Sequence, residues 1–179
     1  NNVIIPNGVT TIEQFAFFQC IGLSSIIIPE SVDEISSSGI FQYCSKLKTA
    51  GPIGSGCNIQ FGWKDKIPNN AFKYGWGNAL ENVDIPDSIT EIGRSAFSGC
   101  IELNKIEIPE NVQSIGNSAF YECSSLITIK IPECVTSIGS SAFSGCRSLR
   151  EIELPDGLTL LNSYIFSGCS SLSDIIIPQ

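Results

Sequence analysis

The sequence predicts a repeat solenoid, a single domain in which short parallel β-strands and tight turns stack as coils, with little helix. Three observations lead to this fold class: a fixed period, a proline that ends each apolar segment, and columns of identical residues. An Ile-Pro or Leu-Pro step recurs every 23 residues, except for one interval of 57. The steps begin at Ile5, Ile28, Ile85, Ile108, Ile131, Leu154 and Ile177. A unit of this length cannot bury its own apolar face, so neighbouring units must share one core, and 1–179 accommodates about eight coils.

Each unit contains one segment whose pattern predicts a short strand. In 103–108 and 126–131 the motif L-x-x-I-x-I ends in an alternation of apolar and outward-facing residues, as in a half-buried strand. The proline that follows has no N–H to donate, so the strand ends there, and the acidic residue after the proline suits a turn. We expect the strands of successive units to pair in parallel, about 4.8 Å apart.

Phenylalanine and glycine recur in columns of their own. The phenylalanine column predicts a continuous aromatic spine in the core. Its members are Phe17, Phe41, Phe72, Phe97, Phe120, Phe143 and Phe166. Gly93, Gly116 and Gly139, with Asn162 in the last copy, form a second column, where we expect a positive φ.

Six of the eight cysteines share a further column: Cys20, Cys44, Cys100, Cys123, Cys146 and Cys169. Side chains in one column point the same way rather than toward each other, so we favour free thiols over disulfides between coils. A buried cysteine acts as a small apolar side chain with a weak S–H donor. Cys57 and Cys134 lie outside this column, and Cys134 falls in a turn, where an exposed thiol is expected.

Composition excludes several function classes. The net charge of -8 and a pI near 4.4 argue against nucleic acid or an anionic membrane as a partner, because both require a basic face. The longest apolar run is far too short to span a bilayer. The chain has no histidine, which removes Ser-His-Asp and Cys-His catalysis and makes a zinc site improbable. The segment GPIGSG (51–56) lacks the Lys-Ser/Thr of a phosphate loop. We therefore predict no catalytic residues, no metal and no cofactor.

A carboxylate follows the proline in most units: Glu30, Asp87, Glu110, Glu133 and Asp156. Such a column could bind Ca²⁺, which prefers clustered oxygen ligands. The alternative, which we favour, is a solvated turn position whose side chain accepts nearby backbone N–H groups.

The L-x-x-I-x-I-P segments and the A-F-x-x-C motif together resemble the leucine-rich repeat superfamily, and more narrowly its BspA-like (Treponema-type) class with 23-residue units. The resemblance covers essentially the whole chain and is most faithful over 85–179. It implies a curved, right-handed β-solenoid with a parallel concave sheet and short convex strands. Members are typically surface or secreted proteins of host-associated bacteria and some protozoa, often implicated in adhesion. The resemblance thus implies a non-enzymatic, extracellular or cell-surface protein-binding module, whose partner is a host or matrix protein or a glycan.

The register of the strands predicts which side chains point outward on the concave face. The charged candidates are Asp84, Lys105, Glu107, Lys130, Glu151 and Glu153. Glu107, Lys130 and Glu153 would be direct cross-strand neighbours of alternating sign, and such pairs contribute about 0.2–1 kcal/mol each. We favour this register-stabilising role. The alternative is a shallow acidic-polar binding surface, which lacks aromatic anchors and therefore suits broad or multivalent binding.

An irregular, expanded repeat over 50–84 interrupts the period. Eight of its surplus residues fall between Pro52 and Ile67, and CNIQFGW (57–63) has the alternation of an extra strand or hairpin arm. Its aromatic side chains either cover a widened core, which we favour for the tryptophans, or form a candidate ligand site. The candidate ligand-binding residues are Phe61, Trp63, Tyr74 and Trp76. Two alternative functions follow. One is a carbohydrate-binding surface at this repeat, where Asp65 and Asp84 would be the pair of carboxylates that a glycosidase needs. The other is a purely structural spacer.

Both ends of the chain carry the repeat motif, as NNVIIP and DIIIPQ. We expect the sequence to be a fragment of a longer array. A bare terminal strand such as 175–177 invites pairing, so flanking repeats, caps or end-to-end self-association through the terminal coils are expected.

Overall fold

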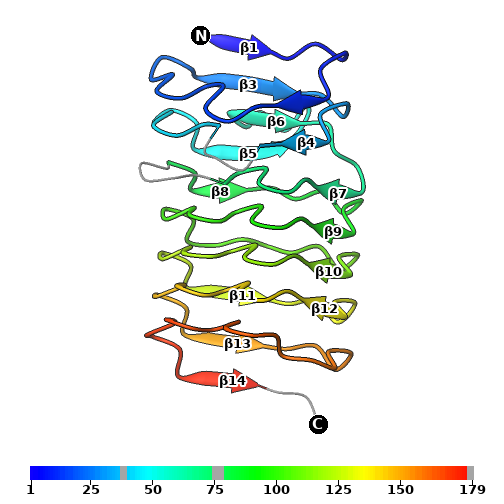
Figure 1. Ribbon diagram of the computed structural model, residues 1–179, viewed down its shortest axis with the longest axis vertical. Helices are drawn as coiled ribbons and strands as arrows, with labels where there is room; N and C mark the ends of the chain where they lie inside the picture. The colour runs from blue at the N-terminus through cyan, green and yellow to red at the C-terminus, as the bar shows by residue number, and fades with distance from the viewer. Residues whose placement is uncertain (37–39, 74–78, 177–179) are drawn as a thin grey trace.

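The computed structural model describes residues 1–36, 40–73 and 79–176. The chain winds as a stack of coils that advances from the first coil at one end to the last at the other (Figure 1). Within the described residues every secondary-structure element is a β-strand, and every strand pairing is parallel. The structure therefore confirms a repeat solenoid of parallel strands.

The longer strands, together with one strand of two residues, lie on one side of the stack, which we call the long-strand face. They form a five-stranded and a three-stranded sheet, and an isolated parallel bridge joins Lys105, in the coil between the two sheets, to Thr128 of the three-stranded sheet. In spatial order these strands are β1 (Asn2–Ile4), β3 (Ser25–Ile28), β6 (Ile59–Phe61), β5 (Thr49–Pro52) and β8 (Asn82–Val83), then β11 (Thr128–Lys130), β13 (Glu151–Glu153) and β14 (Asp174–Ile176).

The other two-residue strands line the opposite side of the stack, at the right in Figure 1. One pair is β2 (Thr11–Ile12) and β4 (Glu34–Ile35), and a second sheet contains β7 (Lys66–Ile67), β9 (Glu91–Ile92), β10 (Ser114–Ile115) and β12 (Ser137–Ile138). In each short strand the second residue is an isoleucine buried in the core. These isoleucines close the core opposite the long-strand face.

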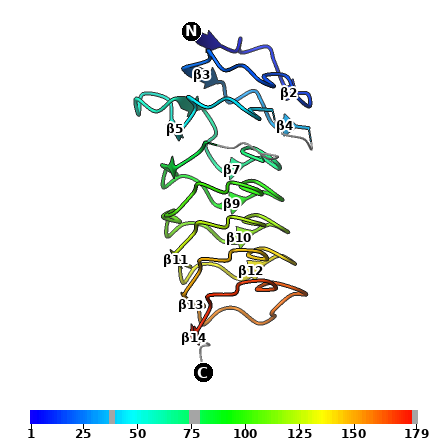
Figure 2. The same cartoon turned by 90° about the vertical axis from the view of Figure 1, so that its left-hand side faces the viewer.

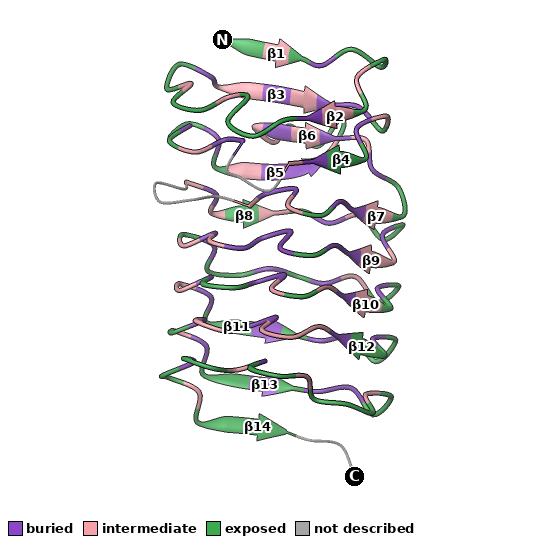
Figure 3. Cartoon of the chain, in the orientation of Figure 1, coloured by how far each residue is buried: buried purple, intermediate pink, exposed green. Residues whose placement is uncertain are grey.

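The phenylalanine column lies between the two faces and stacks in two runs, Phe17 on Phe41 and Phe72 through Phe166. The ring centroids of Phe97 and Phe120 are 5.2 Å apart with an interplanar angle of 8°. Those of Phe120 and Phe143 are 5.4 Å apart with an angle of 2°. Purple segments in Figure 3 mark buried residues in successive coils, as expected for one core shared by all of them.

The glycine column has a different cause from the one predicted. Gly93, Gly116 and Gly139 are absent from the positive-φ positions, which fall two residues later in each turn, at Ser95, Ser118 and Ser141 (φ 53°, 55° and 56°). What excludes a side chain is the preceding coil: a Cβ on Gly116 would lie 2.6 Å from the backbone nitrogen of Arg94. The prediction of a positive φ was therefore wrong here, and the glycines are required for close stacking of backbone on backbone.

The cysteine column forms a ladder of buried free thiols, as predicted. All eight cysteines are free, and five members of the column are buried. Each of these five donates its S–H to the backbone carbonyl oxygen of the phenylalanine one coil earlier. The Sγ–O distances are 3.0 Å (Cys44 to Phe17), 3.2 Å (Cys100 to Phe72), 3.1 Å (Cys123 to Phe97), 3.2 Å (Cys146 to Phe120) and 3.0 Å (Cys169 to Phe143).

Burial raises the pKa of Cys44, Cys123, Cys146 and Cys169, because desolvation disfavours the thiolate. The pKa of Cys44 rises from 9.0 to about 11, and the pKa of Cys123 lies well above its ordinary value for the same reason. Cys134, outside the column, is exposed, and Cys57 is partly exposed. The ladder is therefore protonated and chemically quiet at neutral pH.

The expanded repeat supplies an extra strand to the long-strand face. Although β6 follows β5 in sequence, it lies between β3 and β5 and pairs in parallel with both: Ile59 is opposite Ile26 on one side and Ala50 on the other. Of the two predicted forms, an extra strand is thus correct, and a hairpin arm would have been antiparallel. The interruption is more than an enlarged turn, because β6 separates two coils that would otherwise be neighbours.

Candidate functional site

The aromatic residues of the expanded repeat that the structure describes are part of the core. Phe61 is 1% exposed and Trp63 is 5% exposed. Their ring centroids lie 4.8 Å apart in a stacked arrangement, and both rings contact Phe72 of the spine. Phe61 and Trp63 therefore cover a widened core, the alternative favoured from the sequence for the tryptophans, because they fill the space that the additional strand opens between coils. Tyr74 and Trp76 lie outside the described residues.

Polar side chains of this repeat also hold the coil that contains β4. The indole Nε1 of Trp63 donates a buried hydrogen bond of 2.7 Å to the carbonyl oxygen of Val32. The Nδ2 of Asn70 donates to the carbonyl oxygen of Ile35, 3.2 Å away. Within the described residues β4 pairs only with β2, and β7 belongs to another sheet. The side chains of Trp63 and Asn70 therefore bond backbone carbonyl groups on the side of β4 that has no neighbouring strand.

The connection between β5 and β6, residues 53–58, folds across the long-strand face. In Figure 2 it is the cyan loop that projects from the side of the stack near β5. Gly51 lies beneath it: a Cβ there would lie 2.9 Å from Ser55 Oγ, 3.0 Å from Cys57 Sγ and 3.2 Å from Asp84 Cβ. The loop thus reaches the edge of the charged part of the face, which begins at Asp84.

The residues predicted for the concave face lie together on this part of the molecule. Two adjoining hollows of about 480 Å³ and 530 Å³ lie over the strands from β5 to β14 and share five residues, 105–108 and 110. All six charged candidates line one or both: Asp84, Lys105, Glu107, Lys130, Glu151 and Glu153. The predicted register holds, since Thr128 is opposite Glu151 and Lys130 is opposite Glu153.

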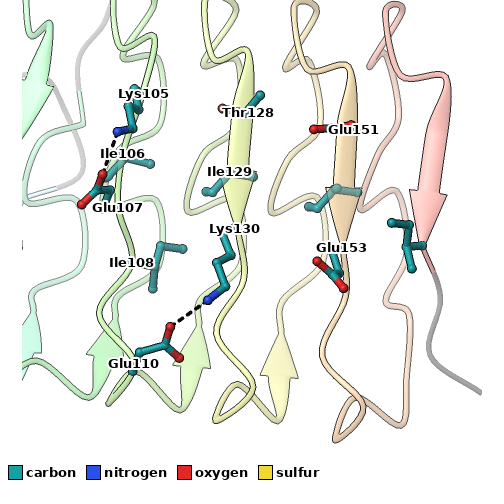
Figure 4. A pocket seen from close by; sticks show the side chains of 12 residues that line it. Lys105, Ile106, Glu107, Ile108, Glu110, Thr128, Ile129, Lys130, Glu151 and Glu153 are labelled. Atoms are coloured by element: carbon teal, nitrogen blue, oxygen red, sulfur yellow. Dashed lines mark hydrogen bonds and ion pairs between the residues drawn. The ribbon is translucent and has the colours of Figure 1, made fainter.

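The ion pairs of this surface differ from those predicted (Figure 4). Lys105 Nζ contacts Glu107 Oε1 at 2.7 Å, two residues along its own strand segment. Lys130 Nζ contacts Glu110 Oε1 at 3.0 Å, in the preceding turn, rather than Glu107 or Glu153 on the neighbouring strands. The expectation of a Glu107–Lys130–Glu153 ladder was correct for strand register but wrong for contact, because lysine side chains are long enough to reach other carboxylates.

These ion pairs shift the pKa of their members in the usual directions. The hydrogen bond and charge of Lys105 lower the pKa of Glu107. The hydrogen bond and charge of Glu110 raise the pKa of Lys130, with smaller contributions from Glu133 and Glu153. All of these side chains are well exposed, so solvent screens the interactions.

The turn carboxylates do not form a cation site in the described ranges, where no three His, Cys, Asp or Glu side chains converge on a common point. Glu30 pairs with Lys64 at 2.6 Å, and Glu133 Oε2 accepts a hydrogen bond from the backbone N–H of Asp156. Asp65 precedes β7 and Asp84 follows β8, strands of opposite faces. The geometry therefore does not favour the glycosidase pairing. The described part of the chain also contains no apolar helix of membrane-spanning length.

An exposed aromatic cluster in the turns of the first two coils escaped the sequence reasoning. Phe15, Phe18 and Tyr43 are 48%, 40% and 40% exposed. The ring centroids of Phe15 and Phe18 are 5.5 Å apart, and those of Phe18 and Tyr43 are 5.7 Å apart, both edge to face. The repeat itself contains the sequence feature that could have revealed this cluster. Phe15 and Phe18 occupy columns that carry serine in later units such as 141–144.

Comparison with known proteins gives a consistent result. The family model for the BspA-type leucine-rich repeat region matches residues 1–54 and 65–179 in six copies. The ten residues left between the two matches contain β6. None of the curated proteins compared matches the chain.

Solved structures of leucine-rich repeat proteins are similar along almost the whole chain. The protein TpLRR of T. pallidum is 27% identical with a TM-score of 0.61, over 99% of this chain and 70% of that one. A protein of Bacteroides ovatus is 29% identical with a TM-score of 0.51, over 99% of this chain and 45% of that one. A protein of Eubacterium ventriosum, 22% identical with a TM-score of 0.59, shares the fold over 99% of this chain and 55% of its own. The chain thus belongs to the family of BspA-type leucine-rich repeat proteins.

Proposed function

We propose that this chain is a non-enzymatic interaction module of a bacterial cell-surface or secreted protein, and that it binds a protein partner through the long-strand face. One observation carries the proposal: charged side chains from successive coils gather over two adjoining hollows on that face. The surface location is supported by the resemblance to BspA-like proteins, which are typically surface or secreted.

The chemistry of the described residues favours binding over catalysis. Catalytic acids and bases usually sit in enclosed sites where burial and neighbouring charges shift their pKa values strongly. Here the carboxylates are exposed, and Glu107 and Glu110 are paired with lysines. A shallow surface of this kind suits a partner that spans several coils.

The face can be tested by blocking it. Purified chain is immobilised and its affinity for a panel of extracellular-matrix proteins and glycans is measured. Thr128 is exposed between Lys105 and Glu151 in the outward column, so Thr128→Trp adds bulk in the centre of the face. Thr159→Trp places the same bulk at an exposed position outside both hollows.

We expect Thr128→Trp to weaken protein binding at least about tenfold by steric exclusion, and Thr159→Trp to leave it unchanged. Equal loss in both variants would assign binding to another surface. Binding to no panel member would favour the spacer role, and concentration-dependent mass in sedimentation would reveal the self-association expected from the terminal coils. Circular dichroism of both variants checks that the fold is retained.

A further inference from the structure

The two hollows of the long-strand face form one continuous surface with an excess of negative charge. Their shared residues belong to the coil of Lys105, between the strands β8 and β11. Carboxylates outnumber lysines six to two along this surface. The carboxylates are Asp84, Asp87, Glu107, Glu110, Glu151 and Glu153, and the lysines are Lys105 and Lys130.

Both lysines of the surface are already neutralised by carboxylates of the surface itself. Lys105 contacts Glu107 and Lys130 contacts Glu110. Two of the six carboxylates are thereby compensated, and the cations present no uncompensated positive charge to an incoming partner. An acidic partner would have to break both ion pairs, which disfavours it.

The carboxylates of β13 contact no cation in the part of the chain that the structure describes. Among the described residues neither Glu151 nor Glu153 forms an ion pair. Lys130 is near enough to sense the charge of Glu153, but its ammonium group lies against Glu110. Figure 4 shows both glutamates without a dashed contact. Asp174 of β14 lies opposite Glu151 in the ladder and extends the acidic column.

Apolar surface accompanies these charges. Ile152, between the two glutamates, is buried and closes the floor of the hollow, and Ile176 at its rim is 58% exposed. Lysine and arginine side chains cover apolar surface with their aliphatic stems while the charged end reaches a carboxylate. The surface therefore offers a basic segment both an apolar area for the aliphatic stems of its side chains and carboxylates for their charged ends.

We infer that the long-strand face from β8 to β14 is a docking surface for an extended basic segment of a partner protein, with Glu151 and Glu153 as its principal anchors. The inference rests on the proposed function and specifies the chemistry of the partner. The observation that decides it is charge complementarity: an uncompensated acidic strand beside lysines that are already paired.

A defined probe tests this inference. The probe is a fluorescein-labelled peptide of alternating lysine and serine, which in an extended strand presents all its lysines on one side. A peptide of alternating glutamate and serine is the reversed-charge control. The variants are Glu151→Gln/Glu153→Gln and, with the same change in net charge, Asp33→Asn/Glu34→Gln at exposed positions at the start of β4, outside both hollows.

We expect the lysine peptide to bind, the glutamate peptide not to bind, and affinity for the lysine peptide to fall as salt rises. Glu151→Gln/Glu153→Gln should weaken binding about 5- to 20-fold, and Asp33→Asn/Glu34→Gln less than about twofold. Equal weakening by both pairs would reduce the effect to net charge and overturn the inference. So would an affinity that neither pair changes, or preference for the glutamate peptide.

The outcome is separable from that of the proposed function. If matrix proteins bind and Thr128→Trp blocks them, while Glu151→Gln/Glu153→Gln changes nothing, the long-strand face remains the binding surface and only the basic partner is refuted. If the lysine peptide binds as expected but no natural protein does, the acidic surface stands without a biological partner in the panel.

Discussion

The Sγ of Cys146 donates a hydrogen bond to the backbone carbonyl oxygen of Phe120, 3.2 Å away and one coil earlier. The same oxygen accepts the backbone N–H of Cys123 within its own turn. The thiol therefore joins the turn of one coil to that of the next. Repetition of this contact ties the aromatic column to the cysteine column along the stack.

Removing one rung should weaken the solenoid measurably. Cys146→Ala deletes the S–H donor and leaves a small void at a fully buried site, so we expect the free energy of unfolding to fall by about 1–2 kcal/mol. Urea denaturation at fixed protein concentration measures the change. Cys134→Ala, at an exposed thiol, is the control and should leave the midpoint unchanged. Identical midpoints for both variants would show that the ladder contributes only packing that alanine can replace.

Thiol reactivity in the folded protein should follow burial. Cys134 is exposed, Cys20 and Cys57 are partly exposed, and the other five thiols are buried. With an excess of a chromogenic disulfide reagent, we expect a fast phase from Cys134, slower reaction of Cys20 and Cys57, and the remainder only after denaturation. Cys134→Ser should abolish the fast phase. Fewer than eight reactive thiols in denaturant without reductant would contradict the free-thiol assignment.

The ladder should also make stability sensitive to alkaline pH. Burial raises the pKa of Cys44 from 9.0 to about 11, so between these values the unfolded chain has lost a proton that the folded chain retains. The unfolded state then binds fewer protons, and stability, fully present below about pH 9, falls as pH rises toward about pH 11. The loss that Cys44 contributes across that window is on the order of 1–2 kcal/mol.

Thermal unfolding at about pH 8 and about pH 10.5 tests this linkage. The parent chain should lose more stability between the two conditions than Cys44→Ala does. Lysines and tyrosines titrate in both proteins, so the difference between the two slopes isolates the thiol. Equal slopes would mean that Cys44 ionises in the folded state as readily as in the unfolded chain.

The glycine column offers a test of close stacking. A Cβ on Gly116 would lie 2.6 Å from the nitrogen of Arg94 and 2.7 Å from the carbonyl carbon of Gly93. These are backbone atoms of the preceding coil and cannot move aside singly, so Gly116→Ala should destabilise the protein by about 3 kcal/mol or more. Gly8→Ala is the control, since nothing lies within 4 Å of its added methyl group. A neutral Gly116→Ala would indicate that neighbouring coils can separate without loss.

The emission of Trp63 reports on the expanded repeat. Because Trp63 is 5% exposed, stacked on Phe61 and bonded to Val32, we expect blue-shifted emission that acrylamide quenches weakly. The measurement uses the Trp76→Phe variant, in which Trp63 is the remaining indole. Emission near that of free tryptophan would place Trp63 in solvent and reopen the ligand-binding role that its burial removes.

Features that repeat along the chain were predictable from the sequence. Each residue in a column meets its own counterpart one coil away, so spacing alone predicts contact. Phe97 against Phe120 and Thr128 opposite Glu151 follow from the 23-residue period. The six charged candidates on the long-strand face were found in the same way, because alternation in a strand decides which side chains point outward.

Features that depend on non-repeating contacts were not predictable. The choice of Glu110 over Glu107 by Lys130 depends on side-chain reach across a turn. The position of β6 between β3 and β5 depends on which strands are available for pairing when the chain returns toward β3 after β5. The geometry of the exposed Phe15–Phe18 contact depends on side-chain rotamers, which the 23-residue repeat does not determine.

The sequence by itself therefore determined the solenoid, its columns and the buried thiol ladder, since translational repetition converts a sequence interval into a spatial neighbour. The tertiary structure alone decided why the glycines are glycines, where the additional strand lies and that Trp63 belongs to the core. It also decided which carboxylates remain unpaired on the long-strand face. Each of these features depends on close contacts between atoms of different repeats. The intervals between residues in the sequence do not predict such contacts where the period breaks.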